Sequence, residues 1–424
     1  MSPAEHSTPL HAQGEVAEFQ GLYGTFHVHE ILLQKIWLRR EFLQTEARTG
    51  DGERLEILDP GRWNRLAGPD FLGARLRIAG REVRGDVEIH FRADSWIQHG
   101  HDRDPAYDNV VLHVVLFPPP AYAPPARTRS GRAIPVLALM DLLWHDLEEY
   151  ATDDAIAALS RRDPWPALEQ LLALPGEERR AVIEQAAQRR WEEKCHFAAM
   201  RIRRLGWAEA CHQTALEVLG YRSNRVAMLH VAQLHPLGSW CERRPPVSRL
   251  YDSAQGVWSS RGTRPANHPR RRLEQYVRWM EARPDWPARL RRFALPSVDG
   301  CGLDAGVARL RRRLGMAGLR QAIAHEICAD TLGGDRFDTW IANLAFPFLA
   351  AADQEEAARL LWFAWYPGDA PDSHRMAARQ LTDGRRQPVS NGLLQAIIAL
   401  QLDHWRADGA MPLESRDRSG GASG

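Results

Sequence analysis

The stretch Gly68–Phe91 reads GPDFLGARLRIAGREVRGDVEIHF, and it carries the pattern that decides the fold of the N-terminal part of the chain. Apolar residues alternate with basic or polar residues over 72–79, Gly80 interrupts the alternation, and a second alternating run covers 82–91. A period of two is typical of β-strands, and a glycine between two such runs favours a turn. The stretch therefore predicts two neighbouring strands joined as a hairpin.

Ionisable residues on the second of these strands indicate a chemical role. Asp86, Glu88 and His90 are two residues apart, so their side chains share one face, while the apolar residues between them face a core. Asp70 opens the preceding strand after a Gly-Pro turn, and a hairpin of this length would bring it beside Glu88. Two carboxylates with a nitrogen group suit Mg²⁺ or Mn²⁺, and such a site can activate a water for attack on phosphorus.

A solvated strand face is the simpler interpretation of the same residues. The run Val110–Phe117 argues against it, because this run is apolar on both faces and indicates a central strand in a covered sheet. Ionisable side chains inside a covered sheet are costly unless they bind something. The sequence leaves both interpretations open.

The flanking segments extend the sheet and add helices. Over Val28–Phe42 the spacing of apolar residues predicts an amphipathic helix. Further strands are predicted at Arg54–Leu58, Asn109–Phe117 and Ala133–Met140. Helical patterns prevail in the remainder of the chain. We therefore predict an α+β protein, with an α/β core over residues 21–145, a mostly helical, arginine-rich region over 146–410, and disordered tails at 1–20 and 411–424.

The order of the N-terminal elements resembles the αβββαβ core of the PD-(D/E)xK nuclease superfamily, the restriction-endonuclease-like fold. In that superfamily an Asp on the second strand and a (D/E)xK motif on the third hold the metal and orient the water. An acidic residue on the first helix often assists. The resemblance implies that Asp70 is the first acid, Glu88 the second, and Glu30, or else Glu41, the helix acid. His90 takes the position of the lysine.

The histidine at this position departs from the motif of the superfamily. Lysine occurs in the chain only at Lys35 and Lys194, so chemistry that usually uses lysine needs another residue here. A histidine can orient or deprotonate a water near neutral pH, because its ordinary pKa lies close to 7. His90 could equally mark a core that has lost activity.

A longer resemblance covers most of the chain. The segments GPDFLGARLRI, GDVEIHFRADSWIQHGHDRDPAYDNVVLHVV, LGYRSNRVAMLHVAQL and RPANHPRRRL are similar to the bacterial family known as domain of unknown function 2851. The similarity runs from about Glu30 to about Leu400. It implies a family identity, and it implies no activity, because none is established for that family.

The block Asp94–His113 is dense in side chains that bind ligands. His99 and His101 with Asp104 could bind a transition metal, although their spacing matches no known zinc motif. Alternatively the block forms the rim of a cleft, where aromatic rings stack on bases and histidines contact phosphate. A structured loop without a ligand is the third interpretation. The candidate substrate-binding residues in and near this block are Asp86, Trp96, His99, His101, Tyr107 and Asn109.

The helical region contains many arginine pairs, which either line solvated helix faces or contact a nucleic-acid backbone. The stronger candidates for specific contacts are the segments GYRSNR, Gly220–Arg225, and RPANHPRRR, Arg264–Arg272. Both are expected at loop-to-helix transitions, where backbone N–H groups and guanidinium groups, such as those of Arg222 and Arg225, together favour phosphate.

Other classes of protein are disfavoured. The longest apolar runs are too short to span a bilayer, and the first residues lack the basic and apolar regions of a secretory signal. The five cysteines form no CxxC pair, and no GxSxG, P-loop or dinucleotide-binding motif is present. These features predict a soluble, cytoplasmic protein without a membrane partner.

Three functions remain compatible with the sequence. The first is a metal-dependent nuclease that uses Mg²⁺ or Mn²⁺ to cleave DNA or RNA held by the basic helical region. The second is a catalytically inactive nucleic-acid-binding or scaffolding protein on the same core. The third is a metal-dependent enzyme for a small substrate, in which His99 and His101 join the face formed by Asp86, Glu88 and His90.

Overall fold

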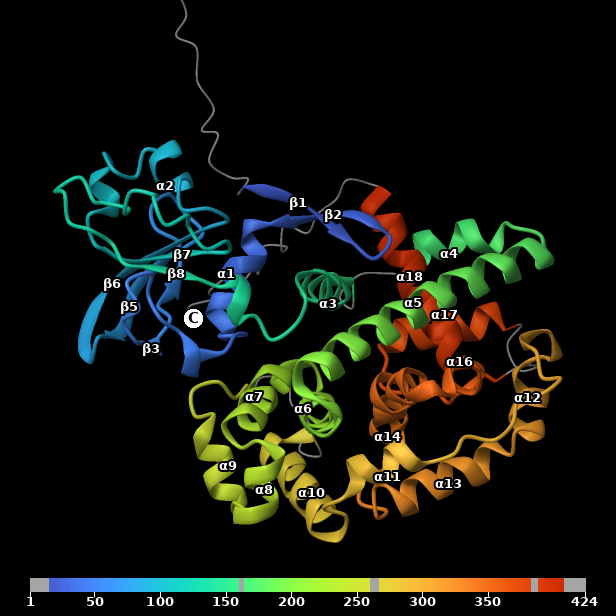
Figure 1. Cartoon of the computed structure of the whole chain (residues 1–424). Helices are drawn as coiled ribbons and strands as arrows, with labels where there is room; N and C mark the ends of the chain where they lie inside the picture. Colours follow the sequence, from blue (N-terminus) through green and yellow to red (C-terminus); the bar gives the residue numbers. More distant parts are fainter. Residues whose placement is uncertain (1–14, 160–163, 260–266, 383–387, 408–424) are drawn as a thin grey trace, which may run out of the picture. The chain divides into compact units, whose positions relative to one another are not determined.

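The structure, a computed structural model, describes residues 15–159, 164–259, 267–382 and 388–407 of the chain. It is a mixed α+β protein with an N-terminal sheet and a helical C-terminal region, as expected (Figure 1). The chain divides into two compact units, Met1–Thr152 and Asp153–Gly424. The first unit contains the predicted hairpin with Asp70, Glu88 and His90.

The main sheet of the first unit has the strand order β3-β5-β6-β7-β8, and a short strand β4 pairs with β5. The β3–β5 and β5–β6 pairs are antiparallel, whereas β6–β7 and β7–β8 are parallel. A parallel pair needs a long connection, and the segment between β6 and β7 provides it. The strands are β3 (Leu55–Asp59), β4 (Arg62–Trp63), β5 (Phe71–Ile78), β6 (Arg81–His90), β7 (Val110–Val115) and β8 (Val136–Ala138).

Strands β5 and β6 form the hairpin that the alternating pattern predicts. Ile78 pairs with Arg81, so the turn consists of Ala79 and Gly80, and both have positive φ. Two-residue turns of this kind match the twist of the strands they connect. In the middle of β6, a Cβ on Gly85 would lie 2.5 Å from the carbonyl oxygen of Asn109. Only a glycine permits this close approach to the chain that enters β7.

Helix α1 (Glu30–Arg39) contributes an apolar face to the core beside the sheet. Leu33, Ile36 and Trp37 on this helix are fully buried, in agreement with the predicted apolar spacing. The indole Nε1 of Trp37 also donates a hydrogen bond to the carbonyl of Pro60 at 3.1 Å. This packing sets the rotation of α1 and so the direction in which Glu30 and Gln34 face.

The polar face of β6 is covered by the segment that connects β6 to β7. This segment contains α2 (Ser95–Gln98) and the one-turn helix η2 (Pro105–Tyr107), and Trp96 anchors it in a small apolar cluster. As a result Glu88 is 5% exposed and His90 is 1% exposed. The solvated-face interpretation of β6 is therefore wrong.

A second, smaller sheet precedes α1 and corrects one expectation. Residues 16–20 were expected in the disordered N-terminal tail, but they belong to β1 (Val16–Gly21), which pairs with β2 (Gly24–His29). The ring of Phe19 stacks on Phe26 and on Phe117, so apolar contacts stabilise the hairpin. Residues 1–14 and the predicted tail 411–424 lie outside the described part of the chain.

The second unit is helical and has its own core. Large aromatic side chains dominate this core, including Trp191, Trp279, Trp340 and Trp362. None of the described helices is long and apolar enough to cross a membrane. The helices after the sheet are α3 (Leu147–Leu159), α4 (Trp165–Leu172), α5 (Gly176–Leu205), α6 (Trp207–Leu219), α7 (Tyr221–Leu234), α8 (Leu237–Arg243), α9 (Val247–Ser253), α10 (Pro269–Ala282), α11 (Trp286–Arg292), α12 (Val307–Arg313), α13 (Met316–Glu326), α14 (Gly334–Trp340), α15 (Phe346–Leu349), α16 (Glu355–Ala364), α17 (Asp372–Leu381) and α18 (Asn391–Ala407).

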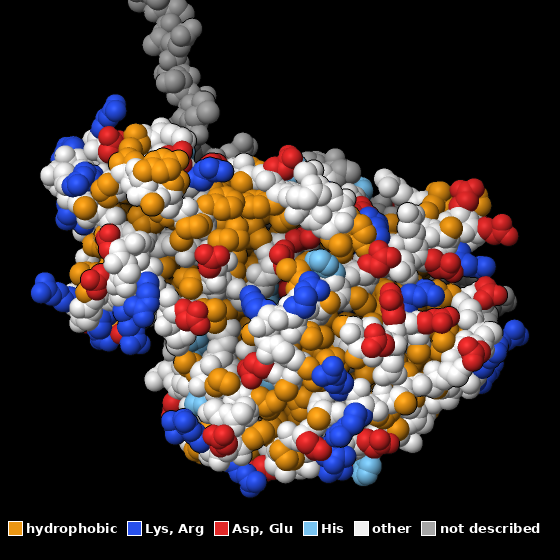
Figure 2. Space-filling view, in the orientation of Figure 1, with side chains coloured by type: hydrophobic (Ala, Val, Ile, Leu, Met, Phe, Trp, Pro, Cys, Tyr) orange, Lys and Arg blue, Asp and Glu red, His pale blue; other side chains and the backbone are white. Residues whose placement is uncertain are grey.

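The charges on the surface of this unit are mixed. Figure 2 shows Lys and Arg side chains interspersed with Asp and Glu side chains on the visible face of the helical region. Mixed signs are typical of a solvated surface, whereas a nucleic-acid footprint is a stripe or patch of one sign. The visible face therefore offers no continuous basic surface.

Candidate functional site

Asp70 and Glu88 lie together where β5 and β6 pair. The backbone N–H of Asp70 donates a hydrogen bond to Glu88 Oε2 at 3.0 Å, and Asp70 Oδ2 accepts one from the N–H of Ile89 at 3.0 Å. Each carboxylate is therefore held by the backbone of the strand or turn that carries the other. Asp70 therefore lies beside Glu88, as the predicted hairpin requires.

Helix α1 brings two further polar side chains to this pair. Gln34 Nε2 donates to Asp70 Oδ1 at 2.6 Å, and Gln34 Oε1 accepts from Trp63 Nε1 at 2.9 Å. Glu30 lies one turn earlier on the same helix face and is buried. The acidic pattern of the helix indicated Glu30 but not Gln34. The spacing of four residues between them is the signal that would have found it.

Burial of these acids strongly affects their protonation. It raises the pKa of Glu30 to about 9, with further contributions from the charges of Asp70 and Glu88. Burial also raises the pKa of Glu88 and the pKa of Asp70. The negative charge of Glu88 raises the pKa of Asp70 further. Ionised carboxylates this close together in a poorly hydrated site need a compensating cation. Carboxylate oxygens such as those of Asp70, Glu88 and Glu30 are the donors that Mg²⁺ and Mn²⁺ prefer. Among the described residues, however, only the ligand atoms of His90, His99 and His101 lie within 4.8 Å of one another as a group of three.

A group of histidines lies on the other side of Glu88. His90 Nδ1 is 2.9 Å from Nε2 of His113, which lies opposite Glu88 on the parallel strand β7. His90 Nε2 is 3.1 Å from His99 Nδ1. The His101 ring stacks on that of His90 with centroids 5.3 Å apart. Burial lowers the pKa of His90, and it lowers that of His113 to about 3. Both imidazoles are therefore neutral at physiological pH.

Glu88 connects the acids to the histidines. Its Oε1 lies 3.2 Å from His101 Nε2 and 3.5 Å from His90 Nε2, while its Oε2 accepts the hydrogen bond from Asp70. Asp104, which the sequence suggested as a partner of His99 and His101, instead caps η2 by accepting from the N–H of Ala106 at 2.9 Å. The carboxylate beside the histidines is thus that of Glu88.

The aromatic residues of the connecting segment support the histidines. Trp96 is fully buried, and its Nε1 donates to the carbonyl of Arg127 at 2.9 Å. The predicted stacking of a base on Trp96 is not possible with this ring enclosed in the core. Tyr107 is also buried and stacks on His101, with centroids 3.7 Å apart. His99 differs from its neighbours in being exposed to solvent.

Asp86 and Asn109 hold the sheet together beside the site. Asp86 Oδ1 accepts from the N–H of Gly73 at 2.9 Å, and its Oδ2 accepts from Asn109 Nδ2 at 3.0 Å. Both carboxylate oxygens of Asp86 are therefore engaged with the neighbouring strand and with the entry to β7. Asp86 and Asn109, both candidate substrate-binding residues, are therefore bonded to each other, as in the interpretation of the block as a structured loop.

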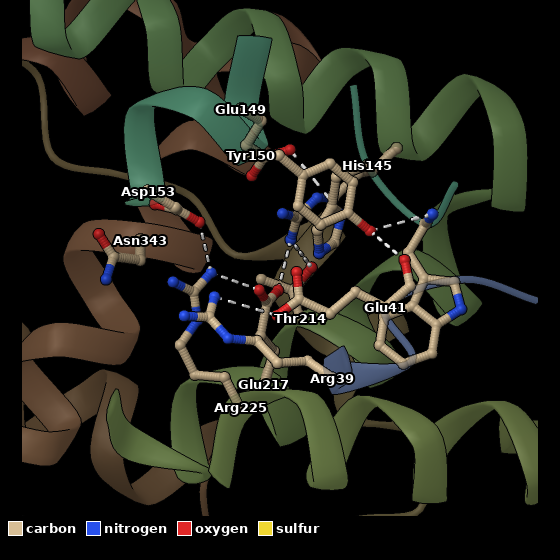
Figure 3. A network of polar contacts seen from close by, with 12 residues as sticks. Arg39, Glu41, His145, Glu149, Tyr150, Asp153, Thr214, Glu217, Arg225 and Asn343 are labelled. Atoms are coloured by element: carbon tan, nitrogen blue, oxygen red, sulfur yellow. Dashed lines mark hydrogen bonds and ion pairs between the residues drawn. The ribbon is translucent and has the colours of Figure 1, made fainter. Parts of the chain in front are cut away.

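Arg225, which was predicted to contact phosphate, forms ion pairs within the protein. Arg225 donates to Asp153 Oδ2 at 2.8 Å and to Glu217 Oε1 at 2.5 Å (Figure 3). Glu217 also accepts from Arg201 at 2.8 Å. The Arg225 guanidinium is thus committed to an ion-pair network. The side chain of Arg222 lies outside the described part of the structure.

The alternative helix acid, Glu41, lies away from the other acids. It follows α1 and forms an ion pair with Arg39, with 3.6 Å between Glu41 Oε1 and Arg39 Nη1. Its backbone carbonyl accepts a hydrogen bond from the hydroxyl of Tyr150 at 2.6 Å (Figure 3). These contacts give Glu41 a structural role and leave Glu30 as the acid of the helix.

Comparison with known proteins identifies a family. Residues 30–248, just over half of the chain, match the model described as "Protein of unknown function (DUF2851)". This match includes α1, the main sheet, and all of the acids and histidines of the candidate site. No curated protein and no solved structure matches the chain. The chain therefore belongs to the DUF2851 family.

Proposed function

We propose that this protein is a metal-dependent phosphodiesterase that cleaves DNA or RNA. The observation that carries the proposal is the pairing of Asp70 with Glu88 beside Glu30, at the meeting point of β5, β6 and α1. The order of one helix, three antiparallel strands and a fourth parallel strand supports it, because a PD-(D/E)xK core has this topology.

The roles of the side chains follow from their surroundings. Asp70 and Glu88 would hold Mg²⁺ or Mn²⁺, which polarises a phosphodiester and lowers the pKa of a bound water. Gln34 and the backbone N–H of Ile89 keep the Asp70 carboxylate in one orientation. By the resemblance His90 takes the position of the superfamily lysine, and its Nε2 lies 3.5 Å from Glu88 Oε1, so it helps to position Glu88.

A cleavage assay tests this proposal. Purified protein is incubated with single-stranded, duplex and branched DNA and RNA, with Mg²⁺, with Mn²⁺ and with EDTA. The matched variants are Glu88→Gln in the site and Glu82→Gln at the exposed end of the same strand, where Glu82 contacts only Arg75 among the ion pairs of the described residues. We expect metal-dependent cleavage that is lost in E88Q and retained in E82Q. Absence of cleavage by folded protein on every substrate, with every ion, would contradict the proposal.

A catalytically inactive nucleic-acid-binding or scaffolding protein is the second candidate. The burial of Glu88 and His90 favours it, because a nucleic acid reaches these groups only if the segment 94–107 moves. The mixed charge of the visible surface fits scaffolding better than nucleic-acid binding (Figure 2). A gel-shift titration with the same substrates in EDTA separates binding from cleavage.

A further inference from the structure

We propose that His90, His99, His101 and Glu88 form a binding site for a transition-metal ion of the zinc class. This site is separate from the oxygen-rich position beside Asp70, and Glu88 lies between the two. It goes beyond the proposed function, since it depends on the histidines and requires no nucleic-acid substrate.

The distances between the ligand atoms fit a tetrahedral centre. His90 Nε2 lies 3.1 Å from His99 Nδ1 and 3.5 Å from Glu88 Oε1, and His101 Nε2 lies 3.2 Å from the same Oε1. Zn²⁺ binds imidazole nitrogen and carboxylate oxygen at about 2.0–2.1 Å in a tetrahedron, which places neighbouring ligand atoms about 3.3 Å apart. One ligand nitrogen from each of the three histidines lies within 4.8 Å of the others. The four atoms thus converge without any rearrangement of the backbone.

The local chain conformation explains how distant residues converge. His90 ends β6, whereas His99 follows α2 directly and His101 comes two residues later. Gly100 between them has a φ of +75°, which L side chains rarely adopt and glycine adopts easily. The turn at Gly100 and the burial of Trp96 hold this loop over β6. The turn at Gly100 therefore lets His99 and His101 both approach strand β6.

A second layer of contacts orients the ligands. An ion on His90 Nε2 leaves the ring proton on Nδ1, which then donates to His113 Nε2 at 2.9 Å. Glu88 is held through its other oxygen by the N–H of Asp70. Tyr107 stacks on His101 and restricts the rotation of that ring. Metal-binding histidines commonly have such supporting partners, because these fix the tautomer and the ring orientation.

The chemistry of the donors selects the class of metal. Three imidazoles and one carboxylate suit Zn²⁺ and related transition ions, whereas Mg²⁺ prefers an octahedral shell of oxygens. The exposure of His99 gives an ion a route from solvent to the otherwise buried donors. In this arrangement His90 acts as a ligand, and its Nε2 is not available as a base.

Metal binding is measured on the whole chain, independently of cleavage. Protein stripped with chelator is titrated with Zn²⁺ by calorimetry in excess Mg²⁺, and Co²⁺ is added as a spectroscopic probe because tetrahedral Co²⁺ absorbs strongly in the visible range. We expect one Zn²⁺ per chain, no displacement by Mg²⁺, and the tetrahedral Co²⁺ spectrum. No binding of Zn²⁺, or an octahedral Co²⁺ spectrum, would overturn the proposal.

Matched variants assign the ligands. His99→Ala changes an exposed ligand, and we expect it to weaken Zn²⁺ binding at least about 100-fold, beyond the usual loss of a supporting partner. His27→Ala removes an exposed histidine on β2 and should bind as the wild type does. Wild-type affinity in H99A, with its circular dichroism unchanged, would refute the assignment. This outcome is distinguishable from failure of the nuclease proposal, which concerns cleavage alone.

Discussion

Asp70 and Glu88 are each anchored by the backbone of the other's strand. The amide of Asp70 donates to Glu88 Oε2 at 3.0 Å, while Asp70 Oδ2 accepts from the amide of Ile89, the residue after Glu88, at 3.0 Å. Both contacts follow from the pairing of β5 with β6, in which Phe71 lies opposite Val87. The strand register therefore positions the two acids, and ligand binding is not needed to bring them together.

The Gln34 side chain should influence catalysis through Asp70. Gln34→Leu keeps the helix and the approximate volume of the side chain but removes the hydrogen bonds to Asp70 and Trp63. We expect cleavage activity to fall about 10–100-fold, as when a partner of a metal ligand is lost. The fall should be smaller at saturating Mn²⁺, because the variant weakens metal affinity first. Activity measured against metal concentration tests this, with Gln44→Leu in the one-turn helix η1 (Gln44–Glu46) as a control. A loss that is independent of metal concentration would contradict the positioning role.

Arg225 should contribute to stability and not to nucleic-acid binding. Its guanidinium donates to Asp153 and to Glu217, and the Glu217 side chain is only 5% exposed. Arg225→Met removes both of these contacts, whereas the ion pair between Arg201 and Glu217 is retained. We expect the free energy of unfolding to fall by about 1.5–3 kcal/mol, the range for a hydrogen bond to a charged group. Chemical denaturation measures the loss, and a gel shift should show unchanged affinity for DNA and RNA. A weaker gel shift from folded R225M would support the phosphate contact predicted from the sequence.

His212 should make the second unit sensitive to acid. The residue is fully buried on α6, with Nδ1 2.7 Å from the hydroxyl of Tyr276 and Nε2 3.1 Å from the carbonyl oxygen of His235. Burial lowers the pKa of His212 from its ordinary value of 6.5 to about 4. The unfolded chain therefore binds this proton more readily than the folded chain does. Stability contributed by neutral His212 is present above about pH 6.5 and is lost as the pH falls toward 4.

The size of this effect follows from the shift of the His212 pKa. One pKa unit corresponds to about 1.4 kcal/mol, so the free energy of unfolding should decrease by on the order of 3 kcal/mol between these pH values. Urea denaturation at a series of pH values measures the change. His212→Gln should be less stable at pH 7 but should show a shallower pH dependence in this interval. An equal slope in wild type and H212Q would contradict the assignment to His212.

The hairpin and its acids could be predicted because they depend on local patterns. Alternation over 72–79 and 82–91 indicates strands, and a glycine between them indicates a turn. Once two strands are paired, geometry brings Asp70 to Glu88. The burial of β6 was only partly predictable. It depends on the cover provided by Trp96, whose apolar cluster includes Ile134, 38 residues further along the chain, and whose Nε1 donates to the carbonyl of Arg127.

The positions of the histidines depend most on tertiary structure. The sequence allowed His99 and His101 to join Glu88 and His90 as one of three alternatives, but their spacing alone could not select it. His113 reaches His90 only because β7 pairs with β6 in parallel, in a register that places it opposite Glu88. Period and turn propensity act over a few residues, so the residue pattern alone determined the strands, the hairpin and the pairing of the two acids. Packing of the loop over β6 and the parallel strand pairing act over longer distances, and this tertiary packing brought four histidines and a glutamate to one place.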